Sequence, residues 1–314
     1  MHKNDMISLV GYSGFVGSNL MKYYKFDKVY NSINISDAFS TNPNVLVYAG
    51  LRAEKYLANN FPEKDYNNIL VAQENIQRID PQKIIFISTI DVYETPIEVT
   101  ESTKINIDNL LPYGKNRLIL ERWIQENFND YLIVRLPGLY GENMKKNFIY
   151  DMINFVPSML NEKKFLHLSN QDEFIKKYYN KLDNGFYKCK EVHGREKKVL
   201  INHFEKLGFS ALNFTDSRGV FQYYNLKFLW EHIQVALNNK IKILNIATEP
   251  IRIDDIYRMI MGKKFENFIL DDIPYYNFKT EYSEIFGGSN GYIFDKDFIL
   301  NDISKFVNQK RKSL

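Results

Sequence analysis

The stretch that decides the fold is "MISLVGYSGFVGSNLMKYYK", residues 6 to 25. It begins as a short apolar run, which is typical of a buried parallel strand, and ends as a helical pattern. Gly11, Gly14 and Gly17 lie between the two in a G-x-x-G-x-x-G pattern. In such a loop the first glycine permits a tight turn and the second lets the backbone approach a pyrophosphate. The third lets the helix pack closely on the strand.

The same loop predicts a binding site for a dinucleotide. Backbone N–H groups at the start of a helix face the phosphates, and the helix dipole favours their negative charge. The residues expected in this site are Gly11, Ser13, Gly14, Phe15, Val16 and Gly17. A simple tight turn is the alternative interpretation of the glycines, but the strand before them and the helix after them favour the dinucleotide.

Apolar runs and helical patterns alternate beyond this loop. The expected strands cover residues 27–33, 43–50, 82–89 and 131–138, and the expected helices cover residues 14–25, 64–79 and 113–127. This rhythm predicts an α/β fold, a Rossmann-type doubly wound parallel sheet with a smaller mixed substrate-binding lobe. The C-terminal ends of the strands, and the loops after them, should then lie along one edge of the sheet.

The second half of the chain is less regular. Helical patterns cover residues 146–155, 228–239 and 252–262, with an apolar run at 242–250, whereas residues 159–214 are expected to be helical in pieces, with a turn at 183–185. The basic tail, residues 308–314, is expected to be solvated. We expect a dinucleotide-binding domain from residues 1–158, completed by 215–248, a helical insertion at 159–214, and a smaller substrate lobe that also includes 249–314.

Composition excludes several classes of function. The 41 Lys and Arg against 38 Asp and Glu give a net charge of only +3, which indicates neither a nucleic-acid nor a membrane partner. The single cysteine, Cys189, excludes an internal disulfide and a thiolate metal cluster, and no two of the five histidines are four residues apart, so we expect no metal. Residues 1–10 have no leader pattern, and no apolar run approaches ~18 residues, so we expect a cytoplasmic protein.

Further motifs follow the later strands in a fixed order. Ala49-Gly50 ends one strand, Thr89 ends the next, and Tyr113 begins a helix with Arg117 four residues later on the same face. Together with the glycine loop, these motifs resemble the extended short-chain dehydrogenase/reductase family, which contains nucleotide-sugar epimerases, dehydratases and reductases. The resemblance covers residues 6–141 well and residues 216–262 more loosely.

The resemblance implies a role for each matched residue. Tyr113 would be the general acid/base, and Thr89 would hydrogen-bond the reacting oxygen. Arg117 stands where the family has lysine, and Asp91 follows Thr89 where dehydratases carry an acid pair. The remaining assignments are cofactor contacts at Ala49, Gly50, Asn68 and Pro137, and substrate contacts at Asn147 and Arg218.

The implied reaction is hydride transfer between a sugar carbon and a nicotinamide, while Tyr113 moves the hydroxyl proton. A tyrosine pKa of ~10 must be lowered for this, and a nearby cation can lower it. Arg117 keeps that charge and could reach the ribose, but it cannot join a proton relay. Ile90 and Asp91 make an incomplete acid pair, so dehydration is disfavoured, and Asp91 also fits a turn or capping residue.

The cofactor is expected to be NAD or NADP. The strand end that normally carries an acid for the NAD ribose has Asn31 instead, which leaves the choice between the two open. The leading hypothesis is an NAD(P)-dependent epimerase or reductase of a nucleotide-activated sugar, serving polysaccharide biosynthesis. The alternative is a non-catalytic protein that binds NAD(P) or a nucleotide sugar. A homodimer through the helices near 68–79 and 113–127 is a further expectation from the resemblance, whereas a nucleic-acid partner is not expected.

Overall fold

The computed structural model describes residues 5–312 and divides the chain into two compact units. Residues 1–4, which belong to the stretch expected to carry no leader, and residues 313–314 of the basic tail lie outside the described residues. Unit 1 contains the chain up to Met144 together with 221–250 and 275–299. Unit 2 contains 145–220, 251–274 and the chain from Leu300 onward.

These bounds differ from the expected ones, most of all in two segments. The dinucleotide-binding unit ends at Met144 rather than at residue 158. The segment 275–299, which was expected in the smaller lobe, belongs to unit 1 because Phe278 is fully buried there against Val92 and Leu118. A hydrophobic side chain buried in this way ties its segment to the unit that covers it.

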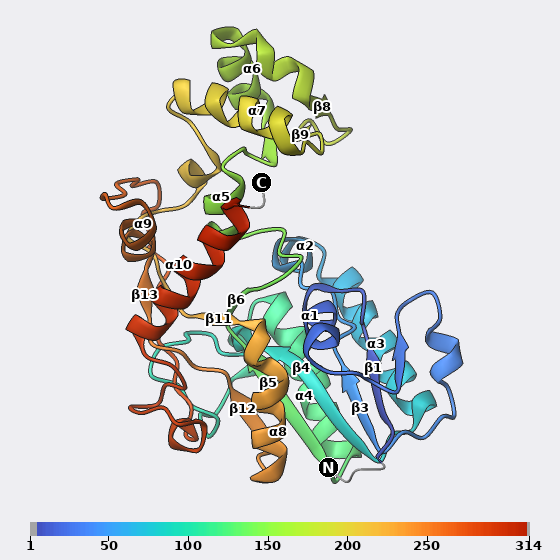
Figure 1. Ribbon diagram of the computed structural model, residues 1–314. Coiled ribbons are helices and arrows are strands. Elements are labelled where there is room, and N and C mark those ends of the chain that lie inside the picture. The colour runs from blue at the N-terminus through green and yellow to red at the C-terminus, as the bar shows by residue number, and fades with distance from the viewer. Residues whose placement is uncertain (1–4, 313–314) are drawn as a thin grey trace. The chain divides into compact units, whose positions relative to one another are not determined.

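Unit 1 is built on six parallel strands in the order β12-β5-β4-β3-β1-β2 (Figure 1). Every residue of β1 and β3 is buried, as in a sheet that is covered on both faces. The doubly wound parallel sheet predicted from the sequence is therefore confirmed. The strands are β1 (Ile7–Val10), β2 (Lys28–Tyr30), β3 (Val45–Tyr48), β4 (Lys83–Thr89), β5 (Tyr131–Leu136) and β12 (Ile243–Asn245).

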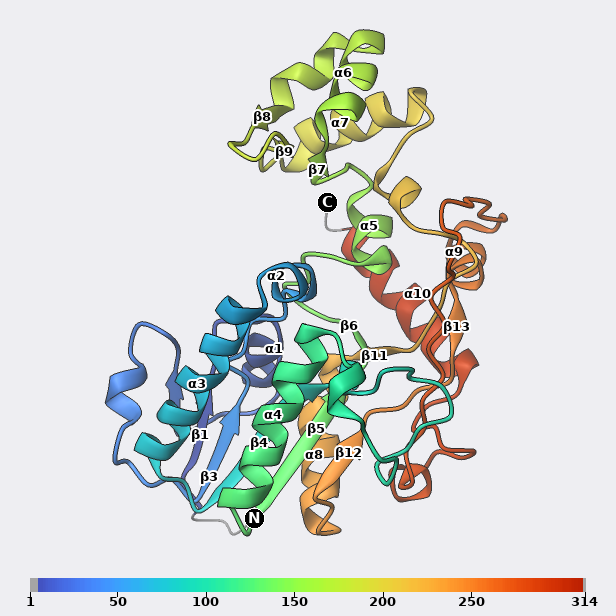
Figure 2. The same cartoon turned by 180° about the vertical axis from the view of Figure 1, so that it is seen from behind.

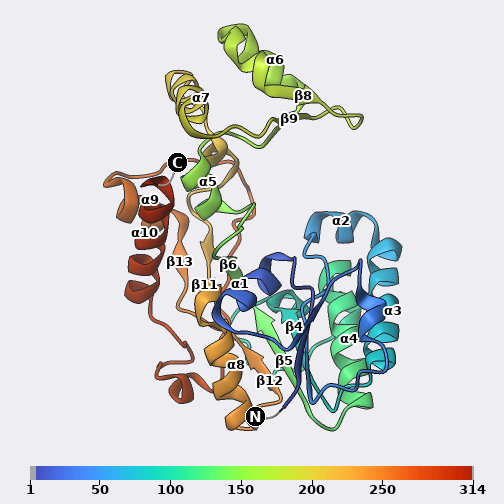
Figure 3. The ribbon, with the colours of Figure 1, turned by 45° about the vertical axis from the view of Figure 1, so that its right-hand side comes forward.

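Helices cover the two faces of this sheet. On one face, Leu20 of α1 and Ile233 of α8 share a core with the strands. On the other face, Ile76 of α3 and Leu120 of α4 pack against a second set of strand side chains. Figure 3 shows α8 on one side and α3 and α4 on the other, and Figure 2 shows α3 and α4 in front. The helices are α1 (Phe15–Tyr23), α3 (Pro62–Ile79), α4 (Pro112–Asn127) and α8 (Leu229–Asn238).

Short elements complete unit 1. The two strands β6 and β11 pair in parallel, and the six-residue helix α2, which the sequence analysis did not anticipate, precedes α3. The bounds are α2 (Lys55–Asn60), β6 (Gly138–Tyr140), β11 (Tyr223–Asn225), and the 3-10 turns η1 (Ile35–Ala38), η2 (Ile90–Val92), η3 (Ile107–Asn109), η6 (Leu226–Phe228) and η7 (Ser283–Phe286).

A buried ion pair joins α4 to the sheet. Arg135 of β5 donates from Nη2 to Glu121 of α4 over 2.6 Å, and both side chains are almost wholly buried. Ser88 of β4 also donates to Glu121, over 2.5 Å, and Arg135 Nη1 donates to the hydroxyl of Tyr93 over 2.6 Å. Each charge therefore has partners that offset the loss of water.

Unit 2 has a small core of its own. Leu160, Phe165, Ile175, Leu200 and Phe204 pack together within the segment expected to be a helical insertion. The bounds are α5 (Phe148–Asn154), β7 (Met159–Leu160), α6 (Glu162–Gln171), η4 (Glu173–Tyr178), β8 (Tyr179–Lys181), β9 (Tyr187–Cys189), α7 (Gly194–Lys206), η5 (Ala211–Phe214), β10 (Val220–Phe221), β13 (Ile251–Arg252) and α9 (Ile253–Met261).

The insertion is not purely helical. Strands β7, β9 and β8 form an antiparallel sheet, and the expected turn at 183–185 is confirmed as the connection between β8 and β9. The helix expected across residues 172–182 is a 3-10 turn followed by a strand, because Asp172 caps η4 and Tyr179 is buried in β8. The last helix, α10 (Lys296–Lys312), begins in unit 1 and continues into unit 2. There Arg311 donates to Met152 O over 2.6 Å, so the tail is not simply solvated.

Candidate active site

The glycine loop has the backbone geometry that a phosphate cradle requires. Gly11 has a φ of +93°, and a Cβ there would lie 2.4 Å from Ala49 O. A Cβ on Gly17 would lie 2.1 Å from Gly11 O. Side chains at either position would therefore push apart the turn and the helix that follows it. Because α1 begins at Phe15, its first N–H groups have no acceptor within the helix and face outward as anion donors.

The neighbouring strand ends complete this part of the site. Ala49 and Gly50 follow β3 directly, and Ala49 N donates to Val10 O, so they lie beside the glycine loop. Asn31 follows β2, and its Nδ2 lies 3.4 Å from Ser13 Oγ. The structure thus brings together the predicted cofactor residues at the ends of β1, β2 and β3.

Thr89 and Tyr113 meet at the end of the next strand. Thr89 is the last residue of β4, and Tyr113 lies in the first turn of α4, after Pro112. The Thr89 side chain lies near the hydroxyl of Tyr113 and lowers its pKa, and Thr89 Oγ1 accepts from Asp91 N over 3.2 Å. The ring of Tyr113 is buried, with 8% of the residue exposed. The two hydroxyl groups therefore both lie at the C-terminal end of β4.

Gly114 allows this approach, and the sequence analysis overlooked it. A Cβ on Gly114 would lie 1.8 Å from Asp91 O, so a larger residue would displace the start of α4 from the turn η2. Glycine is a poor helix former, and its presence in the first turn of a helix was the available signal.

Arg117 is held away from the Tyr113 hydroxyl. Its guanidinium lies over the Tyr113 ring, 3.9 Å from the centroid. It donates to both carboxylate oxygens of Asp65 on α3, over 2.5 and 3.1 Å, and to the carbonyls of Tyr113 and Arg52. Four of the five guanidinium donors are thus used inside the protein. The sequence analysis did not anticipate Asp65 as the partner of this cation.

A second cation lies beside Thr89 and Tyr113. Lys55 of α2 donates from Nζ to Asp91 Oδ1 over 2.7 Å and to the hydroxyl of Tyr276 over 3.3 Å. Tyr276 in turn donates to Asp91 over 3.3 Å. Asp91 is therefore not a cap for η2. It is the centre of a small charged cluster.

These neighbours act on Tyr113 in opposite directions. Burial raises the pKa of the Tyr113 hydroxyl most, Arg117 lowers it, Asp91 raises it, and Lys55 and Thr89 lower it. The net direction is upward, so Tyr113 carries its proton at neutral pH. In this state it is a proton donor, and a bound group must help it to act as a base.

The remaining predicted site residues belong to other elements. Asn68 is exposed on α3, and Pro137 joins β5 to β6. Asn147 and Arg218 belong to unit 2. Asn147 caps α5 by accepting from Tyr150 N, and Arg218 makes a paired contact with Asp216.

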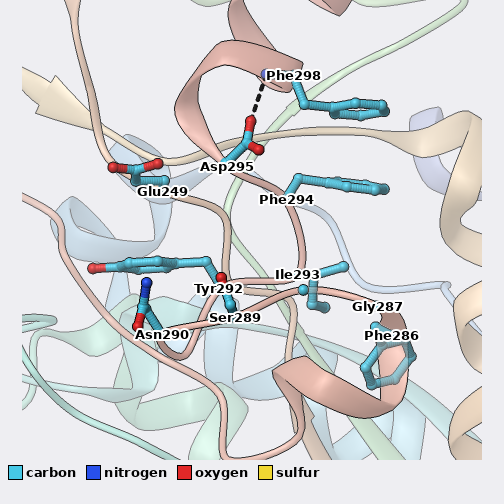
Figure 4. Close-up of a pocket in the computed structure, with 11 residues that line it drawn as sticks. Glu249, Phe286, Gly287, Ser289, Asn290, Tyr292, Ile293, Phe294, Asp295 and Phe298 are labelled. Carbon is cyan, nitrogen blue, oxygen red and sulfur yellow. Dashed lines mark hydrogen bonds between the residues drawn. The ribbon is translucent and has the colours of Figure 1, made fainter.

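A cavity of about 400 Å³ opens elsewhere in unit 1 (Figure 4). Its walls include the stacked rings of Phe294 and Phe298 and the side chains of Glu249 and Tyr292. Neither Thr89 nor Tyr113 is among its lining residues. Because titratable hydroxyl groups and a phosphate cradle occur together at the strand ends, we assign the chemistry there and not to this cavity.

Residues 5–312 contain no cluster of three or more His, Cys, Asp or Glu side chains placed to hold a metal ion. None of the helices in that range is both long and apolar enough to cross a membrane.

Comparison with known proteins rests on structure alone, since no protein-family model and no curated protein matches the sequence. The chain is similar to a UDP-N-acetylglucosamine 4-epimerase of Methanobrevibacter ruminantium M1 in complex with UDP-N-acetylmuramic acid. The identity is 13%, the match covers 100% of each chain, and the TM-score is 0.63.

It is also similar to a UDP-glucose 4-epimerase of Thermotoga maritima with UDP-glucose, at 14% identity, 98% of each chain and a TM-score of 0.61. A third similar structure is a dTDP-4-dehydrorhamnose reductase of Bacillus anthracis strain Ames in complex with NADP. That match has 15% identity, covers 98% of this chain and 99% of the other, and has a TM-score of 0.61. The chain therefore has the fold of the extended short-chain dehydrogenase/reductase family, as the order of its motifs predicts.

Proposed function

We propose that the protein is an NAD(P)-dependent enzyme that epimerises or reduces a nucleotide-activated sugar by hydride transfer. One observation carries the proposal, namely that the buried Tyr113 lies beside the Thr89 side chain at the end of β4. The glycine loop after β1 lies in the same sheet and is shaped for a pyrophosphate. Solved structures with similar folds include complexes with NADP and NADPH, which supports a nicotinamide dinucleotide as the cofactor.

In this proposal the chain's own residues bind, orient and exchange a proton. Gly11 and Gly17 let the turn and the start of α1 pack closely enough to cradle the pyrophosphate, and Thr89 holds the reacting oxygen. Tyr113 gives the proton to that oxygen or takes it away. The nicotinamide supplies or accepts the hydride when it is bound.

The first experiment tests the cofactor and then the substrate. Titration of NADH and NADPH, followed by ligand fluorescence, measures binding directly. A panel of UDP- and dTDP-sugars is then added, with reduction followed by nicotinamide absorbance and epimerisation by proton NMR, because an epimerase returns its hydride. We expect binding of one cofactor and turnover of one sugar class. A protein that binds neither cofactor contradicts the proposal.

A non-catalytic binding protein is the second candidate, and Arg117 favours it. Its guanidinium is committed to Asp65, whereas the family lysine belongs to the catalytic motif. Tight cofactor binding without turnover of any nucleotide sugar would support this candidate. Gain of turnover in Arg117→Lys would then assign the loss of activity to that position.

We also propose a homodimer that uses α3 and α4. Leu70 and Val71 on α3 and Leu111 at the start of α4 are exposed apolar side chains in unit 1. Such patches are often covered by a partner. Light scattering of the purified protein tests this assignment. A nucleotide-sugar substrate would also agree with a cytoplasmic location and with polysaccharide biosynthesis.

A further inference from the structure

The segment 52–60 is fastened to the start of α4 at two points. Asn59 Oδ1 accepts from Tyr113 N over 2.9 Å, and Arg117 Nη2 donates to Arg52 O over 2.7 Å. The first contact caps an N–H group that α4 cannot satisfy itself. The helix α2 is therefore positioned by the same residues that form the Tyr113 site.

Arg117 lowers the pKa of the Tyr113 hydroxyl, but its charge is shared with a carboxylate. Its bidentate contact with Asp65 pairs the two charges, and only 4% and 9% of the two side chains are exposed. The field of a close ion pair falls off faster than that of a single cation. None of the four donors in use points to the Tyr113 hydroxyl.

Asp91 places a negative charge near the hydroxyl end of Tyr113. Its backbone N–H donates to Thr89 Oγ1, which fixes the turn that carries the carboxylate. A carboxylate this close to a phenol disfavours the phenolate, because both would be negative. An enzyme that uses Tyr113 as a base would have to compensate that charge.

Lys55 is placed to compensate it. The Lys55 ammonium contacts Asp91 over 2.7 Å and the hydroxyl of Tyr276 over 3.3 Å, which uses two of its three donors. We propose that Lys55 on α2 is a positioning residue whose positive charge balances that of Asp91 beside Tyr113. It takes this role because Arg117, the cation at the motif position, is paired with Asp65. The inference rests on the proposed function in that Tyr113 is taken as the acid/base.

The charges that face these groups agree with this arrangement. Arg117, Asp91 and Lys55 act on Tyr113, and Asp91 and Tyr276 act on Lys55. Burial alone would lower the pKa of Lys55, but Asp91 and Tyr276 raise it above its ordinary value. The ammonium is therefore charged at neutral pH, where Tyr113 carries its proton.

The test measures Tyr113 directly and needs no substrate. A fluorinated tyrosine with a more acidic phenol is incorporated at position 113, and its ionisation is followed by fluorine NMR in the full-length protein. In Lys55→Gln we expect the pKa of this phenol to rise by about one pH unit, since an opposite charge near an ionisable group commonly shifts it by about 1 to 3. Lys55→Arg should preserve the value, and Lys64→Gln, at an exposed lysine of α3, is the matched control.

A double-variant cycle tests whether Lys55 acts by compensating the charge of Asp91 or only by adding positive charge in general. Asp91→Asn alone should lower the pKa of the phenol, and the Lys55→Gln/Asp91→Asn pair should return it to within a few tenths of the parent. A phenol that titrates alike in the parent and in Lys55→Gln overturns the inference, as does a double variant that equals Lys55→Gln. Thermal unfolding verifies that each variant is folded.

Activity gives an independent readout. With a turned-over nucleotide sugar, Lys55→Gln should shift the acidic limb of kcat/KM against pH upward by the same amount where Tyr113 acts as the base, because this limb follows the ionisation of the phenol. If no nucleotide sugar is turned over by the parent, the proposed function fails, but the NMR result still decides the role of Lys55.

Discussion

At position 117, the chemical difference between arginine and lysine decides what the side chain can reach. A guanidinium is a rigid fork that matches a carboxylate, and Asp65 accepts both of its arms. A lysine in the same place would be a single flexible cation. The residue four positions after Tyr113 therefore joins α4 to α3 in this chain, and in our proposal Lys55 supplies the charge that balances Asp91.

Removing the partner of Arg117 should lower the free energy of unfolding. In Asp65→Asn the guanidinium stays buried without a counter-charge, and breaking such a pair costs about 3 to 5 kcal/mol. Urea unfolding measures this loss. Glu74→Gln is the matched control, because it breaks an exposed pair with Arg78 on the same helix and should change stability by less than about 0.5 kcal/mol. Equal effects from both variants would contradict the structural role of Asp65.

The hydroxyl of Tyr113 should be needed for chemistry and not for binding. Tyr113→Phe removes the proton donor and leaves the ring beneath Arg117. We expect turnover to fall by about 10²- to 10⁴-fold, the usual contribution of a general acid or base, with cofactor affinity changed by no more than about twofold. Steady-state kinetics and cofactor titration check the two parts. Full turnover in Tyr113→Phe would remove Tyr113 from the mechanism.

At the scale of elements, local sequence patterns predicted some helices and strands, whereas tertiary contacts determined the others. The alternating strands and helices of residues 6–136 follow from hydrophobic runs and glycines, so their order could be predicted. Thr89 and Tyr113 were found because each lies at a fixed place relative to a strand or helix. Lys55 and Asp65 were not found, because no pattern in the sequence shows which charged residues face Asp91 and Arg117 across 36 and 52 positions.

The same distinction applies to the elements that were missed. The 3-10 turn η4 and strand β8 replace an expected helix, since Tyr179 takes its place in a small core that exists only once α6 and α7 are folded. Helix α2 is only six residues long and begins without a side-chain cap. Contacts with α3 and α4 hold α2 in place, and no local sequence pattern predicts these contacts.

The glycine loop should fail as a unit when its first residue gains a methyl group. In Gly11→Ala the new Cβ would collide with Ala49 O, so we expect loss of cofactor binding by at least about tenfold, beyond the roughly 1 kcal/mol of backbone strain. Gly185→Ala is the matched control, because its φ is also positive but nothing lies within 4 Å of the added Cβ. Calorimetric titration measures binding. Unchanged affinity in Gly11→Ala would contradict a phosphate cradle at this loop.

On the scale of the whole molecule, stability should fall in acid through His232 in unit 1. Burial lowers the pKa of His232 to about 4, whereas an unfolded histidine has a value of about 6.5. Neutral, buried His232 makes its full contribution to stability above pH 6.5. That contribution is lost as the pH falls toward 4, because over this range only the unfolded chain takes up the proton. The loss should be on the order of 3 kcal/mol. His232→Gln should flatten this part of the curve in calorimetry, and His167→Gln, at an exposed site, should not.

Asp151 in unit 2 should have the opposite effect, so that stability falls as the pH rises. Burial raises the pKa of this carboxyl from 3.8 to about 7. The folded state then binds a proton that the unfolded chain releases, so the contribution is complete below pH 3.8 and is lost as the pH rises through 7. Asp151→Asn should remove that loss and leave the His232 effect in place. If thermal unfolding of Asp151→Asn follows the parent between pH 4 and 8, the assignment is wrong.

The order of strands along the chain has a consequence for synthesis on the ribosome. Strand β5 ends at Leu136, but its neighbour β12 begins only at Ile243, after most of unit 2 has been made. At roughly 5 to 20 residues per second, the nascent sheet waits about 5 to 20 seconds for its last strand. During that time "YLIVRL" is an apolar edge open to other nascent chains. Translation speed across residues 137–242 should therefore influence the yield of soluble protein.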